Sequence, residues 1–149
     1  MALEEILDQR VIDLNMKARN KEEVIYHLGK LLKRAGYIDD LNGYLEDVYI
    51  REREGITGIG NNVAIPHGKS DFVKRVGIAV GKTEQMIEWE SYDEEPSNLF
   101  FLFAVPSNGE GAKEHLRLIS ELAGKLGNGI TLEKLKAAKN YTELVNAFL

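Results

Sequence analysis

Three side chains in this 149-residue sequence have the type and setting for chemistry: His67, His115 and Arg51. His67 lies in the segment GIGNNVAIPHGKS, residues 58–70, between a proline and a glycine. The proline fixes its own φ and forces the preceding residue into extended geometry, while Gly68 lets the chain leave in almost any direction. We therefore expect an imidazole held at the end of a strand beside a loop, a common place for reactive groups. A turn with an exposed histidine is the plainer interpretation.

His115 and Arg51 are weaker candidates when each is taken alone. His115 lies in the segment KEHL, in the first turn of an expected helix and near its apolar side. A half-buried structural histidine is the plainer interpretation, but a helix N-terminus keeps an imidazole neutral and favours a bound anion. Arg51 begins the run RERE, which is usually a solvated face, although a guanidinium also binds a phosphate or carboxylate through two hydrogen bonds. The third histidine, His27, borders an apolar stripe and is assigned no role.

The composition excludes several classes of site and partner. The absence of cysteine rules out disulfides and thiolate chemistry and fits a reducing cytoplasm, where we expect the protein to act. The net charge of −5 and the lack of a basic block argue against a surface that binds nucleic acid. The start, MALEEILDQR, does not have the pattern of a signal peptide, and the longest apolar run, residues 99–106, is far too short to cross a bilayer. Any membrane role must therefore come through a partner.

No metal or cofactor is expected. The sequence shows no closely spaced cluster of His, Asp and Glu side chains with metal-ligand spacing. It also lacks the glycine-rich phosphate-binding loop that precedes a Lys-Ser or Lys-Thr pair.

Helical spacing of apolar residues predicts two helices in the first third of the chain. Asn20 caps the first, with Glu23 completing a box-like cap, and Gly36 ends it. The second begins near Asp40 and ends in the charged run 51–54.

Three more helices are expected after residue 106. A glycine-rich turn, residues 107–111, leads into the first of them, Thr131 caps the next, and residues 141–149 form the last. The expected inner face of the helix after the turn consists of Ala112, Leu116, Ile119, Ala123 and Leu126.

One strand is expected before the first helix, and the other strands are expected between the first two helices and the last three. Alternating or continuous apolar residues predict strands over residues 11–16, 63–66, 76–80 and 99–105. The last of these is apolar throughout, so we expect a central strand covered on both faces. The length is typical of one domain, residues 1–149. Together these features predict an α/β fold: a layered sandwich whose mixed, mostly five-stranded sheet is flanked by helices on both faces.

The ordered motifs resemble those of a known family. Glu52, Ile59-Gly60 and the run VAIPHG, residues 63–68, are similar to the signature of the fructose/mannitol-type (type 2) enzyme IIA domains of the phosphoenolpyruvate-dependent sugar phosphotransferase system. The strand FLFAVP and the segment EHL, which holds the second histidine, match in the same order, so the resemblance covers nearly the whole chain. One departure is Asn61-Asn62, where many members carry glycine; asparagine tolerates positive φ, so we expect the turn to survive.

The resemblance implies a phosphotransferase with a phosphohistidine intermediate. His67 would accept a phosphoryl group from phospho-HPr and pass it to a IIB domain or subunit, which serves a membrane IIC permease and a sugar. His115 and Arg51 would surround and stabilise the phosphoryl group. A neutral imidazole is a good nucleophile, and phosphoryl transfer chiefly needs positioning and charge stabilisation, so the residues suit this chemistry.

Three functions remain open at this point. The first is sugar transport, with the fructose branch favoured, because the sequence carries no appended DNA-binding module. The second is a regulatory, nitrogen-related IIA-like protein, in which the phosphorylation state of His67 controls partner binding. The third is a small ligand-binding domain whose histidines are structural, which predicts that His67→Ala leaves its function intact.

Overall fold

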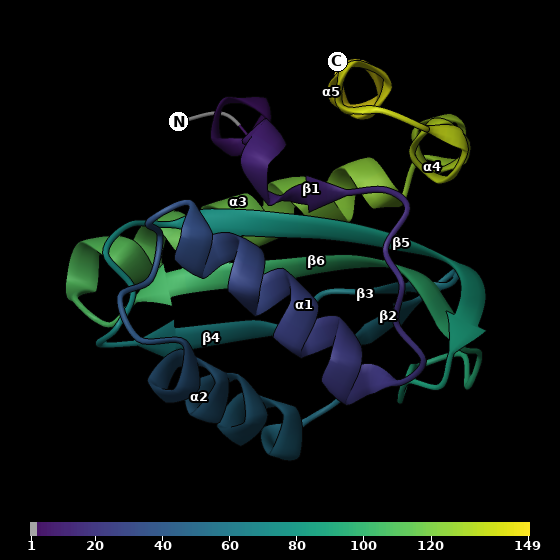
Figure 1. Ribbon diagram of the computed structural model, residues 1–149. Helices are drawn as coiled ribbons and strands as arrows, with labels where there is room; N and C mark the ends of the chain where they lie inside the picture. Colours follow the sequence, from purple (N-terminus) through teal and green to yellow (C-terminus); the bar gives the residue numbers. More distant parts are fainter. Residues whose placement is uncertain (1–2) are drawn as a thin grey trace.

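The structure is a computed structural model that describes residues 3–149, with the side chains of residues 110–112 left undescribed. Within this part of the chain, six strands form one mixed sheet with helices on both faces (Figure 1). The strands are β1 (Ile12–Asp13), β2 (Gly58–Gly60), β3 (Val63–Ala64), β4 (His67–Ser70), β5 (Gly77–Ile87) and β6 (Ser97–Pro106). The helices are the 3-10 helices η1 (Leu3–Ile6) and η2 (Gln9–Val11), then α1 (Lys21–Arg34), α2 (Leu41–Glu54), α3 (Gly109–Leu126), α4 (Gly129–Ala137) and α5 (Tyr141–Phe148). The expected layered α/β sandwich with a mixed sheet is confirmed, whereas the expected count of mostly five strands is too low.

Strand β6 is the centre of the sheet. It runs antiparallel to β5 and parallel to both β3 and β4. β1 adds in parallel to the far side of β5, and β2 adds in antiparallel orientation to β3. In this register His67 lies opposite Phe103, so the central strand places the histidine directly.

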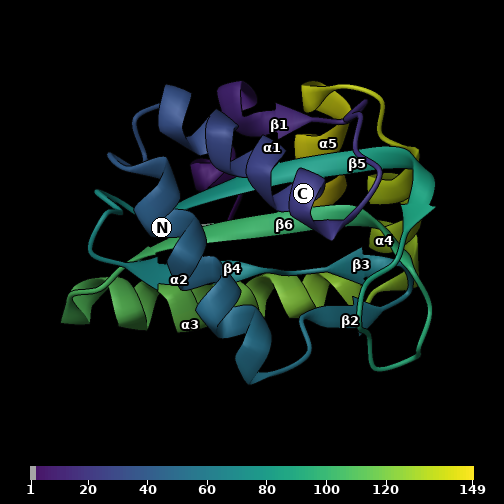
Figure 2. The same ribbon diagram turned by 60° about the horizontal axis from the view of Figure 1, so that its bottom comes forward.

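The side chains of β6 contribute to two hydrophobic cores. Residues 99–105 are fully buried, as their continuous apolar run predicts. Because side chains alternate along a strand, they divide between the faces. Facing α3, α4 and α5 are Leu99, Phe101, Phe103 and Val105. Facing α1 and α2 are Phe100, Leu102 and Ala104. Figure 2 shows α1 and α2 on one side of the sheet and α3 on the other.

The predicted limits of α1 and α2 are confirmed. The Asn20 side chain accepts a hydrogen bond from the Glu23 N–H at 2.9 Å, and Gly36 leaves α1 with a φ of +82°. Asp40 caps α2 by accepting from the N–H of Gly43. These caps satisfy N–H groups that have no partner within the helix.

A tight turn joins β2 to β3. Asn61 and Asn62 form it with φ values of 57° and 68°, and Gly60 precedes them at 93°. Two-residue hairpin turns with positive φ at both positions match the twist of the strands and favour asparagine and glycine. The prediction that asparagine preserves this turn is therefore confirmed.

The expected strands differ from the observed ones in several places. The strand expected over residues 11–16 is reduced to β1, because residues 9–11 form η2 instead. Val76 lies outside β5, and β5 runs on to Ile87, beyond its apolar start. The short strands β2 and β4 were not expected, because the sequences GIG and HGKS carry no apolar alternation.

The limits and inner face of α3 also differ from those expected. The helix begins at Gly109, within the expected turn, and Asn128 rather than Thr131 caps α4. Leu116 is 68% exposed and Ala123 is exposed, while Ile119 and Leu126 do pack against the core. Ala112 lies outside the residues whose side chains are described. The buried stripe is Leu118, Leu122 and Leu126, because this phase buries large leucines where the expected one would bury alanines.

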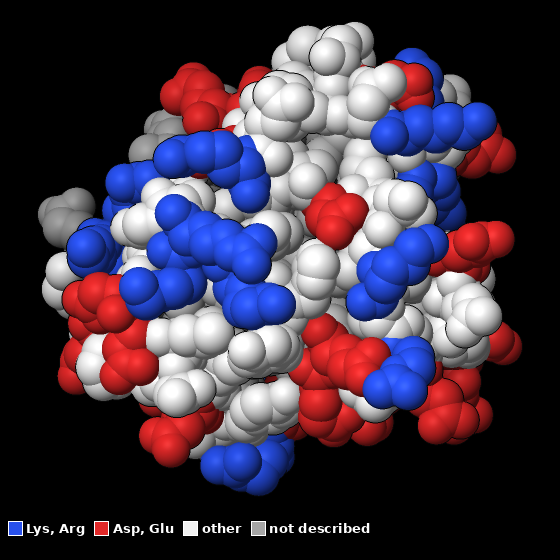
Figure 3. All heavy atoms as spheres, viewed as in Figure 1, with Lys and Arg blue, Asp and Glu red and all other residues white. Residues whose placement is uncertain are grey.

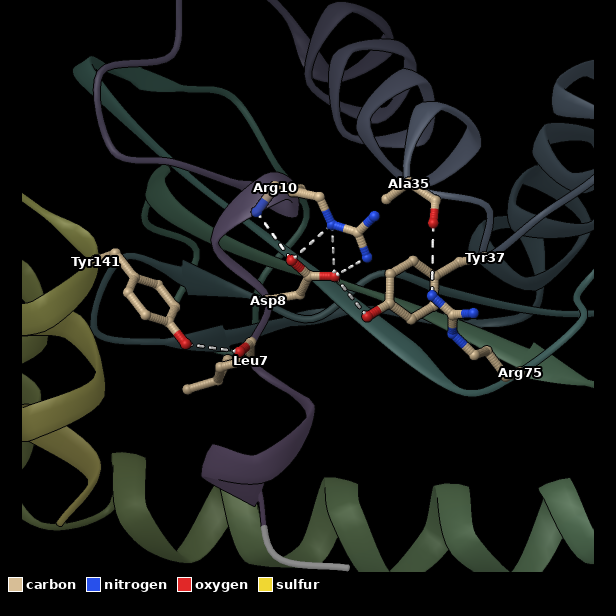
Figure 4. Close-up of polar contacts among 7 residues, drawn as sticks. All are labelled: Leu7, Asp8, Arg10, Ala35, Tyr37, Arg75 and Tyr141. Carbon is tan, nitrogen blue, oxygen red and sulfur yellow. Dashed lines mark hydrogen bonds and ion pairs between the residues drawn. The ribbon is translucent and has the colours of Figure 1, made fainter.

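A polar network fastens the N-terminal segment to the end of α1 (Figure 4). Asp8 accepts hydrogen bonds from Arg10 and from the Tyr37 hydroxyl, and the bonds from Arg10 are the main reason why its pKa is lowered to about 2. The Arg75 guanidinium lies 4.1 Å from the centre of the Tyr37 ring and also donates to the Ala35 carbonyl. These contacts hold the start of η2 against the residues that follow α1.

Positive charge gathers over the C-terminal half of α1 (Figure 3). The last turn of that helix carries Lys33 and Arg34, where cations complement the negative end of the helix dipole. Elsewhere on this face both signs of charge are interspersed (Figure 3). Of the helices in the described part of the chain, none has the length and apolar character needed to cross a membrane.

Candidate functional site

His67 is the first residue of β4, immediately after the proline. The expectation that it ends a strand is therefore wrong: it follows β3 after a two-residue break and begins the next strand. The N–H of Phe103 donates to the Pro66 carbonyl at 3.0 Å, which fixes the chain just before the histidine. Gly68 allows α2 to approach, because a Cβ there would lie 2.7 Å from a methyl group of Val48. The backbone around His67 is thus held from two sides.

The tautomer of His67 follows from one contact. Its Nδ1 lies 3.3 Å from the carbonyl oxygen of Ile65. A carbonyl only accepts hydrogen bonds, so Nδ1 carries the proton. In the neutral ring the lone pair is then on Nε2. His67 is half-buried, so its ring is partly open to solvent and to another molecule.

His115 lies against His67. The two ring centres are 5.0 Å apart with a tilt of 46°. The ring centres of His115 and Phe103 are 5.9 Å apart in an edge-to-face arrangement. The expectation that His115 lies in the first turn of its helix is wrong: α3 begins at Gly109, so His115 is in the second turn. Since the effect of the helix dipole fades within the first turn, it is not what keeps this ring neutral.

Burial keeps both imidazoles neutral. Burial is the largest cause that lowers the pKa of His67, and the nearby Arg51 charge adds to it, whereas the Ile65 carbonyl acts in the opposite direction. For His115, burial and the neighbouring His67, Lys69 and Arg51 lower the pKa to about 4. Both rings are therefore largely neutral at pH 7, the form in which an imidazole is a nucleophile or a hydrogen-bond donor.

Arg51 supplies positive charge to both histidines, and Lys69 supplies it to His115. Arg51 lies in the last turn of α2, half-buried, and its Nη1 donates to the carbonyl of Gly55 at 3.2 Å. Its charge lowers the pKa of both histidines, so the structure brings together the three residues that the sequence singled out.

Lys69 is a residue that sequence reasoning missed. It lies two positions after His67 in β4, and alternate residues of a strand face the same side. Recognition of β4 as a strand would have identified it.

Phosphoryl transfer is the chemistry that this arrangement suits best. A neutral imidazole with a free Nε2 can attack a phosphoryl group. The second neutral imidazole and two cations lie near it and can stabilise the charge on that group during transfer. Within the described residues, no group of three or more His, Asp and Glu side chains could hold a metal ion. An open cleft of about 930 Å³ lies elsewhere, between the start of α1 and the β5–β6 connection, and His67, His115 and Arg51 do not line it.

Comparison with known families decides the relationship. Residues 5–149 match the model of the family described as "Phosphoenolpyruvate-dependent sugar phosphotransferase system, EIIA 2". The chain belongs to this EIIA family. It is therefore a member of a family of phosphotransferases that act through phosphohistidine, and the family resemblance seen in the sequence is confirmed.

The EIIA relatives come from both transport and regulatory proteins. The chain is 36% identical over 83% of its length to the PTS system fructose-specific EIIABC component of Bacillus subtilis, of which it spans 19%. It is 32% identical to the PTS system fructose-specific EIIA component of Haloferax volcanii, over 87% of this chain and 83% of that one. Nitrogen regulatory protein IIA-Ntr from Neisseria meningitidis has a similar crystal structure, with a TM-score of 0.88, 32% identity and 99% of each chain covered. The chain spans about a fifth of the first two curated relatives that it matches, 19% and 22% of their lengths.

Proposed function

We propose that this EIIA protein is a cytoplasmic phosphocarrier that accepts a phosphoryl group on Nε2 of His67. The observation that carries the proposal is the contact between Nδ1 and the Ile65 carbonyl, since it leaves the lone pair on Nε2. The lowered pKa of His67 supports the same assignment, because its burial maintains the neutral, nucleophilic ring at physiological pH. The donor is the phosphohistidine of phospho-HPr.

The transfer step balances without a further reactant. The Nε2 lone pair of His67 forms the new N–P bond while the N–P bond of the donor breaks, and the donor imidazole keeps that electron pair. The proton on Nδ1 stays in place and continues to bond to the Ile65 carbonyl. That carbonyl then stabilises the positive charge that phosphorylation places on the ring. In the onward step a nucleophile of the next acceptor forms a bond to phosphorus while the bond from phosphorus to Nε2 of His67 breaks, and His67 keeps that electron pair.

His115 and Arg51 stabilise the phosphoryl oxygens in this proposal. Nε2 of His115 is buried with no hydrogen-bond partner among the described residues, which leaves it able to bond to an oxygen of the incoming group. Arg51 and Lys69 supply the charge that compensates the developing negative charge. Because the His115 ring is neutral, it stabilises the phosphohistidine less strongly than a cation would, and the group can still leave.

The acceptor in this proposal is a IIB domain or subunit that serves a IIC permease in the uptake of a sugar. The likeness to a fructose-specific EIIABC component and a fructose-specific EIIA component favours the fructose branch. A half-buried His67 suits an exchange with another protein, because a partner reaches the ring without any opening of the fold.

The likeness to IIA-Ntr favours a second candidate function. In that role the phosphorylation state of His67 controls the binding of a partner and the group does not flow to a sugar. Both functions need the same histidine. They are distinguished by the addition of a IIB domain, which removes the phosphoryl group only if the chain acts in transport.

The test is phosphorylation with enzyme I, HPr and phosphoenolpyruvate, followed by intact mass. We expect one added phosphoryl group in the wild type and none in His67→Ala. His27→Ala is the matched control and should be phosphorylated normally, since His27 bonds to Asp13 at 2.8 Å, away from the site. His115→Ala should react more slowly. A wild type that stays unmodified beside phosphorylated HPr would contradict the proposal and return both histidines to a structural role.

A further inference from the structure

Two buried charges lie at helix ends where the helix dipoles oppose them. Lys21 is the first residue of α1, although a cation is disfavoured at a helix N-terminus. Glu52 lies in the last turn of α2, although an anion is disfavoured at a helix C-terminus. Because each charge is unfavourable for the helix that carries it, helix stability does not explain why Lys21 and Glu52 are present at these positions.

The two charges pair with each other. Lys21 Nζ lies 2.6 Å from Oε1 of Glu52 and 2.8 Å from Oε2 of Glu90, which is in the β5–β6 connection. The Glu52 side chain is only 5% exposed and that of Lys21 is 16% exposed. Burial opposes the charge on Lys21, but its hydrogen bonds to the two glutamates outweigh this and raise the pKa of Lys21. Lys21 therefore keeps its positive charge at neutral pH.

Glu52 depends on Lys21 for compensation. Its second oxygen, Oε2, is buried with no hydrogen-bond partner within the described part of the chain. Lys21 is held in turn by Glu90 and by the ring of Trp89, whose centre lies 4.9 Å from Nζ. Trp89 donates to the Thr57 hydroxyl at 2.9 Å. Lys21 thus joins the start of α1 to the end of α2 and to the β5–β6 connection, and Trp89 links that connection to the segment that leads into β2.

Besides this ion pair, the end of α2 is held by the hydrogen bond from Arg51 Nη1 to the Gly55 carbonyl. The C-cap N–H groups of α1 and α4 bond back to their helices, whereas Gly55, in extended geometry after α2, makes no such bond among the described residues. Helix ends without caps fray. Arg51, adjacent to Glu52, extends from this same turn and donates to the Gly55 carbonyl just after it. The direction of its guanidinium therefore depends on how firmly the turn and its C-cap residue are fixed.

We propose that Glu52 and Lys21 are positioning residues that fix the last turn of α2 and thereby aim Arg51 at the phosphoryl group on His67. The inference rests on the proposed function, because it assigns a role in that reaction. Neither residue contacts the phosphoryl group. A buried ion pair contributes little net stability, so its effect lies mainly in geometry.

The test is a double-mutant cycle with Glu52→Gln and Arg51→Ala, read as the rate of phosphoryl transfer from phospho-HPr. Glu52→Gln keeps the shape of the side chain but removes the charge that binds Lys21. We expect it to lower the maximal rate about tenfold, as a small misplacement of a catalytic group does, and to leave the KM for phospho-HPr unchanged. In an Arg51→Ala background the same change should alter the rate less than about twofold, since the group that it aims is gone.

Glu54→Gln is the matched control for charge. Glu54 lies in the same turn and its carboxylate also acts on the pKa of His67, but it is exposed and makes no ion pair with Lys21. It should leave the rate within about twofold of the wild type. An equal loss in Glu54→Gln and Glu52→Gln would overturn the proposal, because charge alone would then explain the effect.

Two further results would also overturn it. One is an equal loss from Glu52→Gln with and without Arg51, and the other is no loss at all. Circular dichroism and the thermal midpoint establish that each variant is folded, and Lys21→Gln takes the place of Glu52→Gln if that variant is not. Failure of the proposed function would look different, since the wild type itself would then accept no phosphoryl group, and the positioning role would be withdrawn with it.

Discussion

Protonation of His115 should make the stability of the protein depend on pH. Burial, together with the nearby His67 and the cations, lowers its pKa in the folded state to about 4, while an unfolded histidine titrates near 6.5. Between these two values the unfolded chain binds a proton that the folded chain does not. The free energy of unfolding therefore has its full His115 contribution above pH 6.5 and loses it as the pH falls towards 4.

The size of the effect follows from the same two values. At about 1.4 kcal/mol per pH unit, the complete loss would be about 3 kcal/mol. The ring is only half-buried, so solvent screens its surroundings and we expect roughly half of that, about 1 to 2 kcal/mol. At pH 5 more than half of the range between the two pKa values has been covered, so the free energy of unfolding should already be lower by about 1 kcal/mol.

The assay is urea unfolding followed by circular dichroism at pH 7.5 and pH 5.0, for the wild type and for His115→Gln. Carboxylates and the other histidines contribute to both proteins, so the difference between them isolates His115. Over this interval the wild type should lose about 1 kcal/mol more than the variant. A difference between the two proteins that does not change with pH would show that His115 has no lowered pKa in the folded state, as would a relative gain by the wild type at pH 5.0.

Three more predictions concern the elements around His67. Asn61→Val should destabilise the protein by about 1 kcal/mol in urea unfolding, because a β-branched residue resists the positive φ of this turn, whereas Asn61→Gly should not, since the exposed Asn61 contributes only its backbone N–H to the turn. Gly68→Ala should cost about 1 to 3 kcal/mol, since its Cβ would meet Val48 at 2.7 Å and Tyr44 at 3.1 Å; an unchanged midpoint would show that α2 moves away without penalty. Because the pKa of His67 is lowered, the acid-side fall in phosphorylation by phospho-HPr should be centred below pH 6.5; a fall centred at pH 6.5 or above, with HPr titrated separately, would contradict the burial of this ring.

Periodicity and capping in the sequence determined much of the fold. The apolar run of β6 predicted a buried central strand, and its residues are fully buried. Asn20 and Asp40 predicted the starts of α1 and α2, because side-chain caps act locally and need no tertiary contact. These signals depend on neighbouring residues alone, so one sequence is enough to find them.

The errors occurred where tertiary contacts determined the structure. The strand β4 reads as HGKS, with no apolar pattern of its own, and exists because it pairs with β6. The inner face of α3 was wrong because two sets of small and large apolar residues have helical spacing, and only packing against the sheet selects Leu118 and Leu122. The sequence therefore placed His67 at the wrong end of a strand and His115 too near a helix terminus.

The candidate site was predicted as a set of residues but not as a geometry. Sequence motifs indicated His67, His115 and Arg51, yet their spacing along the chain did not show that the two rings lie 5.0 Å apart. Two further features of the site could not be predicted from the sequence, because they depend on contacts that the folded backbone makes. They are the proton on Nδ1 of His67 and the ion pair between Lys21 and Glu52.

The most direct measurement is the position of the phosphoryl group on the ring. The protein, labelled with ¹⁵N in its histidines, is phosphorylated through HPr, and the ring nitrogens are assigned by NMR with phosphorus coupling. We expect a phosphorus coupling to Nε2 of His67, with Nδ1 still carrying its proton beside the Ile65 carbonyl. A coupling to Nδ1 of His67, or to a nitrogen of His115, would contradict it.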